Sequence, residues 1–254
     1  MDVIEDIEKL EKPFENAVVT IGNFDGVHLG HQGLFRQVIR QASLINGTSV
    51  VITFDPHPLQ ALGKNSPPLI TRRDQKIELI RDTGVDKIIC IPFSREFAST
   101  EPKEFIYDFL IGKIGMKSII VGPDYSFGKD RKGDIHLLHT ESKKGGFSVI
   151  IPDWVHDAGN GSERISSTKI RKLVMEGRVE DAPRYLGRRY QIRGKVVKGR
   201  DRGGRKLGFP TANIKLHDEL CPKFGVYAVT VETGHGNFRG VANIGYSPTF
   251  DDNM

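Results

Sequence analysis

The sequence is poor in cysteine and has no long apolar segment. Its two cysteines, Cys90 and Cys221, are too few for a disulfide framework or a four-cysteine zinc site. No apolar run approaches the roughly 18 residues that a membrane-spanning helix requires. The first ten residues are acidic and amphipathic, without the basic start and apolar centre of a secretory signal. These absences argue against redox chemistry at a cysteine pair and against a membrane partner, and we expect a cytoplasmic protein.

Positive charge is concentrated in one short segment. The composition is otherwise globular, with 38% hydrophobic and 27% charged residues in 254, a length that predicts two domains. Nine of the 37 lysines and arginines lie between Arg188 and Lys206, which suits an anionic ligand such as phosphate. Nucleic acid is an alternative partner, but Tyr190 is the one aromatic residue of that segment, which leaves no platform for stacking bases. We therefore expect a small phosphorylated ligand and no nucleic acid.

Short β-branched runs alternate with helical segments over the first 150 residues. The predicted strands are Ala17–Phe24, Thr48–Phe54, Asp86–Pro92, Ser118–Gly122 and Phe147–Pro152. The predicted helices are Gly30–Ile45, Thr71–Thr83, Glu101–Ile114, Asp134–Lys144 and Ser166–Gly177. Nearly continuous apolar strands are typical of a parallel sheet that is covered on both faces. The pattern predicts an α/β fold with a Rossmann-like, doubly wound parallel sheet and ligands at the carboxyl ends of its strands.

The pattern changes after Gly187. Tyr190–Val197, Gly225–Thr233 and Phe238–Ile244 are predicted strands separated by glycine-rich turns, with no helical segment between them. Such a series is typical of an antiparallel β-barrel or sandwich. We place the domain boundary between residues 186 and 187, which gives domains of residues 1–186 and 187–254.

The segment Gly22-Asn23-Phe24-Asp25-Gly26-Val27-His28-Leu29-Gly30-His31 joins the first predicted strand to the first predicted helix. Helix amides and the positive end of the helix dipole favour an anion at this place, and the glycines would let the backbone approach it. His28 and His31 lie three positions apart, so both rings can donate to phosphate oxygens from one side of the helix. The pair could also be half of a zinc site, but no further ligand has convincing spacing. Phosphate binding is favoured.

This segment resembles the first signature of the nucleotidyltransferase superfamily. Ile165-Ser166-Ser167-Thr168-Lys169-Ile170-Arg171 resembles its second signature, which would place hydroxyls, amides and cations at another helix start. Relatives that adenylylate or cytidylylate phosphopantetheine or glycerol phosphate share the first signature. They generally lack an attached module that contains Pro-Thr-Ala-Asn, which this sequence has at 210–213.

Three further segments resemble the bacterial bifunctional riboflavin kinase and FMN adenylyltransferase family, also called FAD synthetase. They are Thr53-Phe54-Asp55-Pro56-His57-Pro58, Val121-Gly122-Pro123-Asp124-Tyr125-Ser126-Phe127-Gly128 and Leu207-Gly208-Phe209-Pro210-Thr211-Ala212-Asn213. The resemblance implies that the first domain transfers AMP from ATP to FMN, giving FAD and pyrophosphate. It also implies that the second domain phosphorylates riboflavin to FMN. ATP, FMN and riboflavin are then the small-molecule substrates, with Mg²⁺ accompanying ATP.

The resemblance also implies roles for individual residues. The implied catalytic residues are His28 and His31. The implied ATP-binding residues are Gly22, Asn23, Phe24, Gly30, Ser166, Ser167, Thr168 and Arg171, and the implied flavin-binding residues are Asp124, Phe54 and Pro56. We expect Asp25 to order the first loop rather than to contact substrate. In the second domain, Gly199–Gly208 resembles a glycine-rich flap over ATP phosphates. Gly208, Thr211 and Asn213 are the implied nucleotide and Mg²⁺ residues there, with Thr211 and Asn213 as the metal ligands.

Riboflavin kinases of this family continue well beyond the segment that here ends at Phe250. The resemblance implies that the further part holds the glutamate base for the riboflavin hydroxyl, together with the closing strands of an otherwise incomplete barrel. This chain ends four residues later. We therefore expect unpaired strand edges and exposed apolar side chains in the second domain. FAD synthesis is the expected activity, and riboflavin phosphorylation by this chain stays open.

Overall fold

The computed structural model describes residues 2–157, 163–197, 211–216 and 219–245. The chain folds into two compact units, Met1–Ser167 and Thr168–Met254. In the described ranges, no helix is both long enough and apolar enough to cross a membrane.

A six-stranded parallel sheet forms the centre of the first unit. Its strands are β1 (Asp2–Ile4), β2 (Ala17–Ile21), β3 (Ser49–Asp55), β4 (Lys87–Pro92), β5 (Met116–Ile120) and β8 (Ser148–Ile150). They lie in the order β1-β4-β3-β2-β5-β8, and every neighbouring pair is parallel. Five of these strands lie close to their predicted bounds. The edge strand β1 is not predicted from the sequence, because three residues of an acidic segment carry no strand periodicity.

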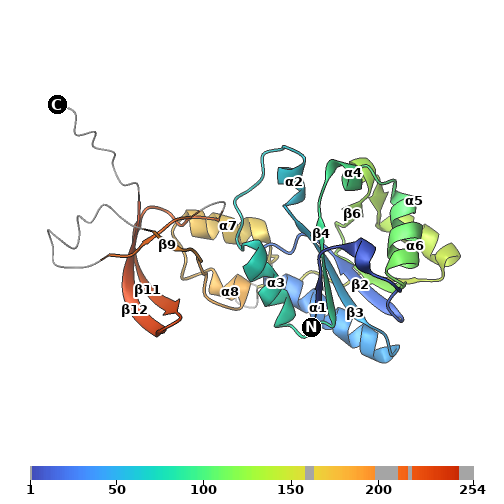
Figure 1. Cartoon of the computed structure of the whole chain (residues 1–254), viewed down its shortest axis with the longest axis horizontal. Helices are drawn as coiled ribbons and strands as arrows, with labels where there is room; N and C mark the ends of the chain where they lie inside the picture. The colour runs from blue at the N-terminus through green and yellow to red at the C-terminus, as the bar shows by residue number, and fades with distance from the viewer. Residues whose placement is uncertain (1, 158–162, 198–210, 217–218, 246–254) are drawn as a thin grey trace. The chain divides into compact units, whose positions relative to one another are not determined.

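Helices cover both faces of this sheet (Figure 1). Alternate strand residues enter two different cores, as the period of a β-strand requires. Val19, Val50 and Ile52 pack with the segment 105–114 and Leu138, whereas Val51 packs on the opposite face with Phe35. The covering helices are α1 (Leu29–Leu44) and α3 (Arg73–Arg81) on one face, and α5 (Pro102–Glu104), the π-helix Phe105–Lys113 and α6 (Ile135–Gly145) on the other. The predicted doubly wound α/β fold is confirmed.

The predicted helix Glu101–Ile114 differs in type. After one α-helical turn the chain forms a nine-residue π-helix, which the apolar periodicity does not distinguish from an α-helix. The shorter elements of this unit connect the layers. They are η1 (Ile7–Lys9), α2 (Pro58–Ala61), α4 (Arg95–Ala98), β6 (Ser126–Phe127), η3 (Lys129–Arg131) and β7 (Gly133–Asp134).

The second unit contains two helices and two antiparallel strand pairs in its described part. Its elements are α7 (Ser167–Met175), α8 (Pro183–Leu186), β9 (Val196–Val197), β10 (Asn213–Ile214), β11 (Gly225–Thr233) and β12 (Gly236–Ile244). β9 pairs with β10, and β11 pairs with β12. The predicted strand Tyr190–Val197 is reduced to its last two residues. Val226 and Val241 are 72% and 73% exposed, as expected for strands without a covering layer in the described part of this unit.

Candidate active site at the switch point of the sheet

The order of the strands locates the site. After β2 the chain moves outward through β3 and β4, and it then returns to the other side of β2 to form β5 and β8. The connections therefore leave the adjacent strands β2 and β5 in opposite directions. Such a switch point opens a crevice at the carboxyl ends of the strands, where doubly wound proteins bind ligands. The loops at 22–28 and 121–125 follow these two strands, at the place where this architecture predicts a ligand.

Asp25 holds the loop that follows β2. Its side chain is 5% exposed, and its carboxylate accepts hydrogen bonds from the backbone N–H groups of Ile70 and Thr71 at 3.1 and 3.0 Å. The hydroxyl of Thr71 lies 3.2 Å from the same carboxylate and also accepts the N–H of Gly26 at 3.0 Å. These contacts fix the loop against the segment before α3, in agreement with the role expected for Asp25.

His28 and His31 meet at the start of α1. His28 is the N-cap of this helix, and its Nδ1 accepts the backbone N–H of His31 at 3.3 Å. An accepting Nδ1 leaves the proton of the neutral ring on Nε2, which can donate to a ligand. The two rings are stacked, with centroids 3.5 Å apart and planes at 19°. The geometry therefore brings the two implied catalytic side chains together.

The environment of His31 keeps its ring neutral. Burial is the main cause that holds the pKa of His31 well below its usual value, and electrostatic interactions with His28, Lys76 and Arg164 act in the same direction. Its Nδ1 is buried and has no hydrogen-bond partner among the described residues. A buried polar atom without a partner costs free energy, and such atoms are typical of functional sites rather than of stabilising contacts.

This lowered pKa predicts a loss of stability in mild acid. The unfolded chain takes up a proton near pH 6.5 and the folded chain resists it, so the free energy of unfolding should fall as the pH decreases from about 6.5 toward the folded pKa. The extra slope is at most about 1.4 kcal/mol per pH unit. Urea unfolding followed by the fluorescence of Trp154, the single tryptophan, measures it in the wild type and in His31→Gln. Equal slopes in the two proteins between about pH 7.5 and 5.5 would show that the folded state does not disfavour the protonated ring.

Phe24 and the two glycines, all implied ATP-binding residues, lie against the protein's own side chains. Phe24 is 4% exposed, and its ring packs edge-on against His31 and Phe35 at 5.2 and 4.8 Å. The Phe24 side chain therefore supports His31 from the core, and a contact of its backbone with ATP stays a prediction. A Cβ at Gly22 would lie 2.9 Å from the Phe24 ring, and one at Gly30 would lie 3.0 Å from the His28 ring. Side chains larger than glycine would therefore crowd these rings, and the approach of ATP to the two glycine backbones stays a prediction.

An unpredicted cation, Arg164 from the segment after β8, pairs with a residue of the loop after β5. The guanidinium of Arg164 stacks over Trp154 at 3.1 Å from the ring centroid, and its Nη2 lies 3.0 Å from Oδ2 of Asp124. Asp124 is exposed, and its carboxylate forms an ion pair with Arg164. Arg164 directly precedes the second signature. This place in the sequence is the feature that could have singled out Arg164 as a candidate site residue.

The two ends of the second signature lie in different units. Ser167 is the last residue of the first unit, and its hydroxyl donates to the carbonyl oxygen of Asp25 in the same unit at 2.9 Å. This hydroxyl is engaged with protein, whereas Ser166 is half-buried nearby in sequence. Thr168 is exposed and Arg171 half-buried, and both lie in α7 within the second unit. Their contact with ATP stays a prediction.

Two of the implied flavin residues lie at the end of β3 and in the loop that follows it. Phe54 is half-buried and Pro56 exposed, and the ring of Phe54 packs edge-on against Phe93 at 5.3 Å. A row of ring contacts continues from Phe54 to the loop after β5. Its members are Phe54, Phe97, Phe105, Phe127 and Tyr125, at successive centroid distances of 6.0, 6.0, 5.6 and 5.5 Å. Burial raises the pKa of the Tyr125 hydroxyl, which therefore stays neutral. The row joins the two loops that resemble the flavin-binding segments.

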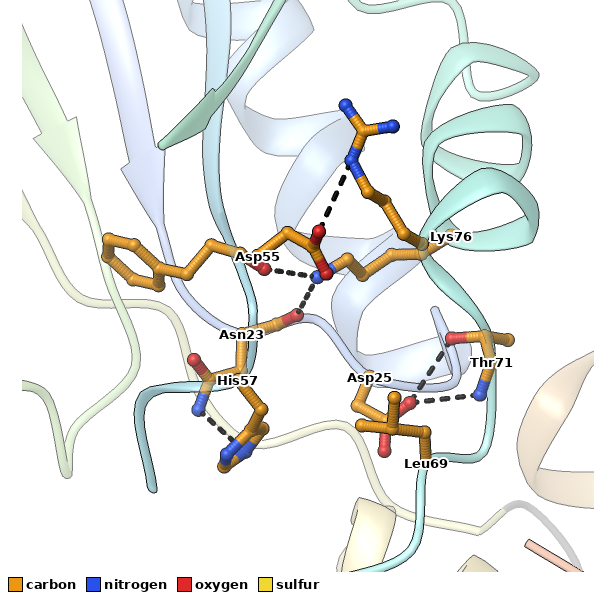
Figure 2. Close-up of a pocket in the computed structure, with 9 residues that line it drawn as sticks. Asn23, Asp25, Asp55, His57, Leu69, Thr71 and Lys76 are labelled. Carbon is orange, nitrogen blue, oxygen red and sulfur yellow. Dashed lines mark hydrogen bonds and ion pairs between the residues drawn. The ribbon is translucent and has the colours of Figure 1, made fainter. Parts of the chain in front are cut away.

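A small pocket opens between the loops after β2 and β3 (Figure 2). Its lining residues are Asn23, Asp25, Phe54, Asp55, His57, Leu69, Thr71, Arg73 and Lys76. The side-chain amide of Asn23 lies 3.3 Å from Nε2 of His57. Lys76 was not expected here, because lysine on a helix is normally exposed.

The implied kinase residues are described in part. Thr211 and Asn213 are exposed, and Asn213 begins β10. Gly208 and the rest of the implied flap from 199 lie outside the described residues. No three histidine, cysteine, aspartate or glutamate side chains within the described ranges are grouped so that they could hold a metal ion.

Comparison with known proteins identifies relatives over nearly the whole chain. The family model for FAD synthetase matches residues 10–169, and that for riboflavin kinase matches residues 186–254. A bifunctional riboflavin kinase/FMN adenylyltransferase of Buchnera aphidicola subsp. Schizaphis graminum is 41% identical and covers 98% of this chain and 80% of its own length. The Escherichia coli K12 protein of that name is 38% identical, with 98% and 79% covered. A crystal structure described as a macrolide-efflux protein from Streptococcus pneumoniae matches with TM-score 0.84 and 35% identity, over 98% of this chain and 80% of that one.

Proposed function

The chain belongs to the family of bifunctional riboflavin kinases and FMN adenylyltransferases, and we propose that it transfers AMP from ATP to FMN. The products are FAD and pyrophosphate. The stacked pair of His28 and His31 at the start of α1 carries this proposal, because it presents ring donors where a phosphate would bind. Both rings lie beside helix amides at the switch point of the sheet, the general place for nucleotides in this architecture.

The transfer needs positioning and charge stabilisation rather than a base. A phosphate oxygen of FMN attacks the α-phosphorus of ATP, a new P–O bond forms, and the bond to the pyrophosphate oxygen breaks. FMN is already anionic, so no proton has to leave the nucleophile. Negative charge grows on the oxygens around the α-phosphorus and on the leaving pyrophosphate, and fixed donors stabilise it. His28, through Nε2–H, and the neutral ring of His31 are proposed to supply those donors.

Arg164 adds a cation to the same crevice, and the aromatic row adds an apolar surface. We propose that Arg164, Ser166, Thr168 and Arg171 hold the triphosphate, since guanidinium groups and hydroxyls bind phosphate oxygens well. The flavin ring would lie against Phe54 and Pro56, where stacking and burial favour an aromatic ligand. Asp124 is balanced by Arg164, which supports a role beside the flavin rather than as a metal ligand.

Mg²⁺ would enter the first reaction as part of the ATP complex. In the second domain, Thr211 and Asn213 offer a hydroxyl and an amide oxygen, which are hard donors of the kind that Mg²⁺ binds. Two such side chains fit an ion that is held mainly by nucleotide phosphates and water. We propose this nucleotide and Mg²⁺ role for Gly208, Thr211 and Asn213, with domains of residues 1–186 and 187–254, and with the cytoplasm as the place of action.

The test is to incubate the purified chain with Mg-ATP and either FMN or riboflavin, and to separate the flavins by chromatography. FAD from FMN supports the proposal, and its absence in a folded chain refutes it. FMN from riboflavin would show that the kinase reaction proceeds as well. AMP transfer to phosphopantetheine or glycerol phosphate but not to FMN would identify another nucleotidyltransferase.

Thr211→Ala should leave the rate of FAD formation from FMN within about twofold of wild type, because changes at independent sites do not couple. The same variant should reduce FMN formation from riboflavin if the wild-type chain catalyses it. The two rates are measured in separate assays, with FMN or riboflavin as the supplied flavin. A large loss of FAD formation from FMN would show that the two domains depend on one another.

A further inference from the structure

Lys76 places a cation in the interior next to the first loop. It belongs to α3, is 8% exposed, and lines the pocket between the loops after β2 and β3. Its Nζ donates to the carbonyl oxygen of Phe54 at 2.7 Å and lies 3.3 Å from that of Asn23 (Figure 2). One side chain of α3 therefore bonds to the backbone of the loop after β2 and to the backbone at the end of β3.

These two contacts begin where the sheet ladder stops. The pairing of β2 with β3 ends at Ile21 and Ile52, and a last backbone bond joins Gly22 to Ile52. Asn23 lies in the loop beyond that point, and Phe54 lies in the last part of β3, which extends past its pairing with β2. The hydroxyl of Thr53 donates to the same Asn23 oxygen at 3.2 Å. The side chains of Asn23 and His57 also meet beyond the ladder, at 3.3 Å, whereas Lys76 donates directly to a backbone carbonyl on each side.

A lysine is unfavourable at this buried position, because its ammonium group loses the hydration that it has in water. Burial lowers the pKa of its amine, and nearby Arg73 acts in the same direction, whereas the Cys90 thiol and the carboxylates of Asp25 and Asp55 favour the charged form. An apolar side chain would pack in the same volume without a desolvation cost. What an apolar side chain could not do is bind two carbonyl groups that point into the interior. The arrangement therefore indicates that Lys76 fixes the relative position of the two backbone segments more than it stabilises the fold.

We propose that Lys76 is a positioning residue for AMP transfer, which sets the spacing between the loop that leads to His28 and His31 and the end of β3 with its following loop, which carry Phe54 and Pro56. The first loop is assigned to ATP and the second to the flavin, so this proposal rests on the proposed function. Each loop has further contacts of its own, through Asp25 and through the pairing of Phe54 with Ile91. Each should therefore still bind its own substrate when Lys76 is replaced.

Lys76→Met tests the proposal, because methionine keeps the unbranched stem and removes the charge and the donors. We expect kcat for FAD formation to fall about 10- to 100-fold, the cost of a small misplacement of reacting groups. The dissociation constants should change less than about threefold. FMN is titrated by its own fluorescence, and ATP by calorimetry. Arg81→Met, which removes an exposed cation from the same helix, is the matched control and should have wild-type kcat.

The outcomes separate positioning from packing. A lower kcat with nearly unchanged dissociation constants and a cooperative thermal transition supports the proposal. Wild-type kcat, or a loss explained entirely by weaker binding of one substrate, overturns it. If Lys76→Met does not fold, Lys76→Gln is measured in the same way. Glutamine keeps two N–H donors and lacks the charge. Wild-type kcat in that folded variant overturns the need for the cation. A wild-type chain that forms no FAD refutes the proposed function itself, and this proposal with it.

Discussion

His31→Ala is expected to reduce the rate of FAD formation from FMN about 100- to 1,000-fold, the usual cost of losing one donor to a developing negative charge. The ring stacks on His28 and packs edge-on against Phe24, so its removal should also lower thermal stability by a few degrees while the chain stays folded. The position of His31 in the sequence alone would indicate a purely electrostatic role, but its ring contacts add a packing role. Initial rates at saturating Mg-ATP and FMN measure the effect.

A second substitution distinguishes a neutral donor from a positive charge. The pKa of His31 is held well below its usual value, so the ring should act as a neutral donor at about pH 7 to 8. His31→Asn keeps a neutral N–H donor and should be faster than His31→Ala by about tenfold. His139→Ala, an exposed histidine of α6, is the control and should have the wild-type rate. Full activity in His31→Ala, or equal activity in the alanine and asparagine variants, would contradict this assignment.

The fold of the first unit follows from local pattern. Buried parallel strands are nearly continuous in apolar residues, which makes β2, β3 and β4 visible in the sequence. The glycines and both histidines after the first predicted strand indicate an anion site by themselves, whereas the second signature is recognised only by its resemblance to a known family. The position of the switch point follows from the order of the strands in the sheet, which the sequence alone does not give.

Other parts of the site depend on contacts that no local pattern contains. Phe24 has a positive φ that turns its ring inward, although its neighbours Asn23 and Gly22 are typical of a surface loop. Arg164 reaches Trp154 because the chain reverses between them, with an antiparallel bridge from His156 to Arg164. Lys76 is indistinguishable from a solvated helix residue until α3 is placed against the ends of β2 and β3. Tertiary packing, rather than propensity, decides these three positions.

Asp25→Ala is the substitution with the largest expected effect on stability. Its carboxylate accepts three hydrogen bonds at 3.0 to 3.2 Å, two of them from backbone N–H groups, and its side chain is 5% exposed. Alanine would leave those donors buried without an acceptor. We expect the free energy of unfolding to fall by about 3 to 5 kcal/mol, because each orphaned buried donor costs about 1 to 3 kcal/mol and a charged acceptor strengthens the bonds that are lost.

Trp154 reports on the unfolding of the first structural unit, because it is the single tryptophan of the chain and lies in that unit with Asp25. Urea unfolding followed by its fluorescence gives the free energy for that unit without a contribution from the second. Asp82→Ala removes an exposed carboxylate and should change the same quantity by less than about 0.5 kcal/mol. An equally small change in Asp25→Ala would show that the loop after β2 holds its shape without the carboxylate. A large change would establish that the loop which presents both histidines is fixed through the segment that precedes α3, so that the ligand-binding geometry and the stability of the first unit depend on the same buried group.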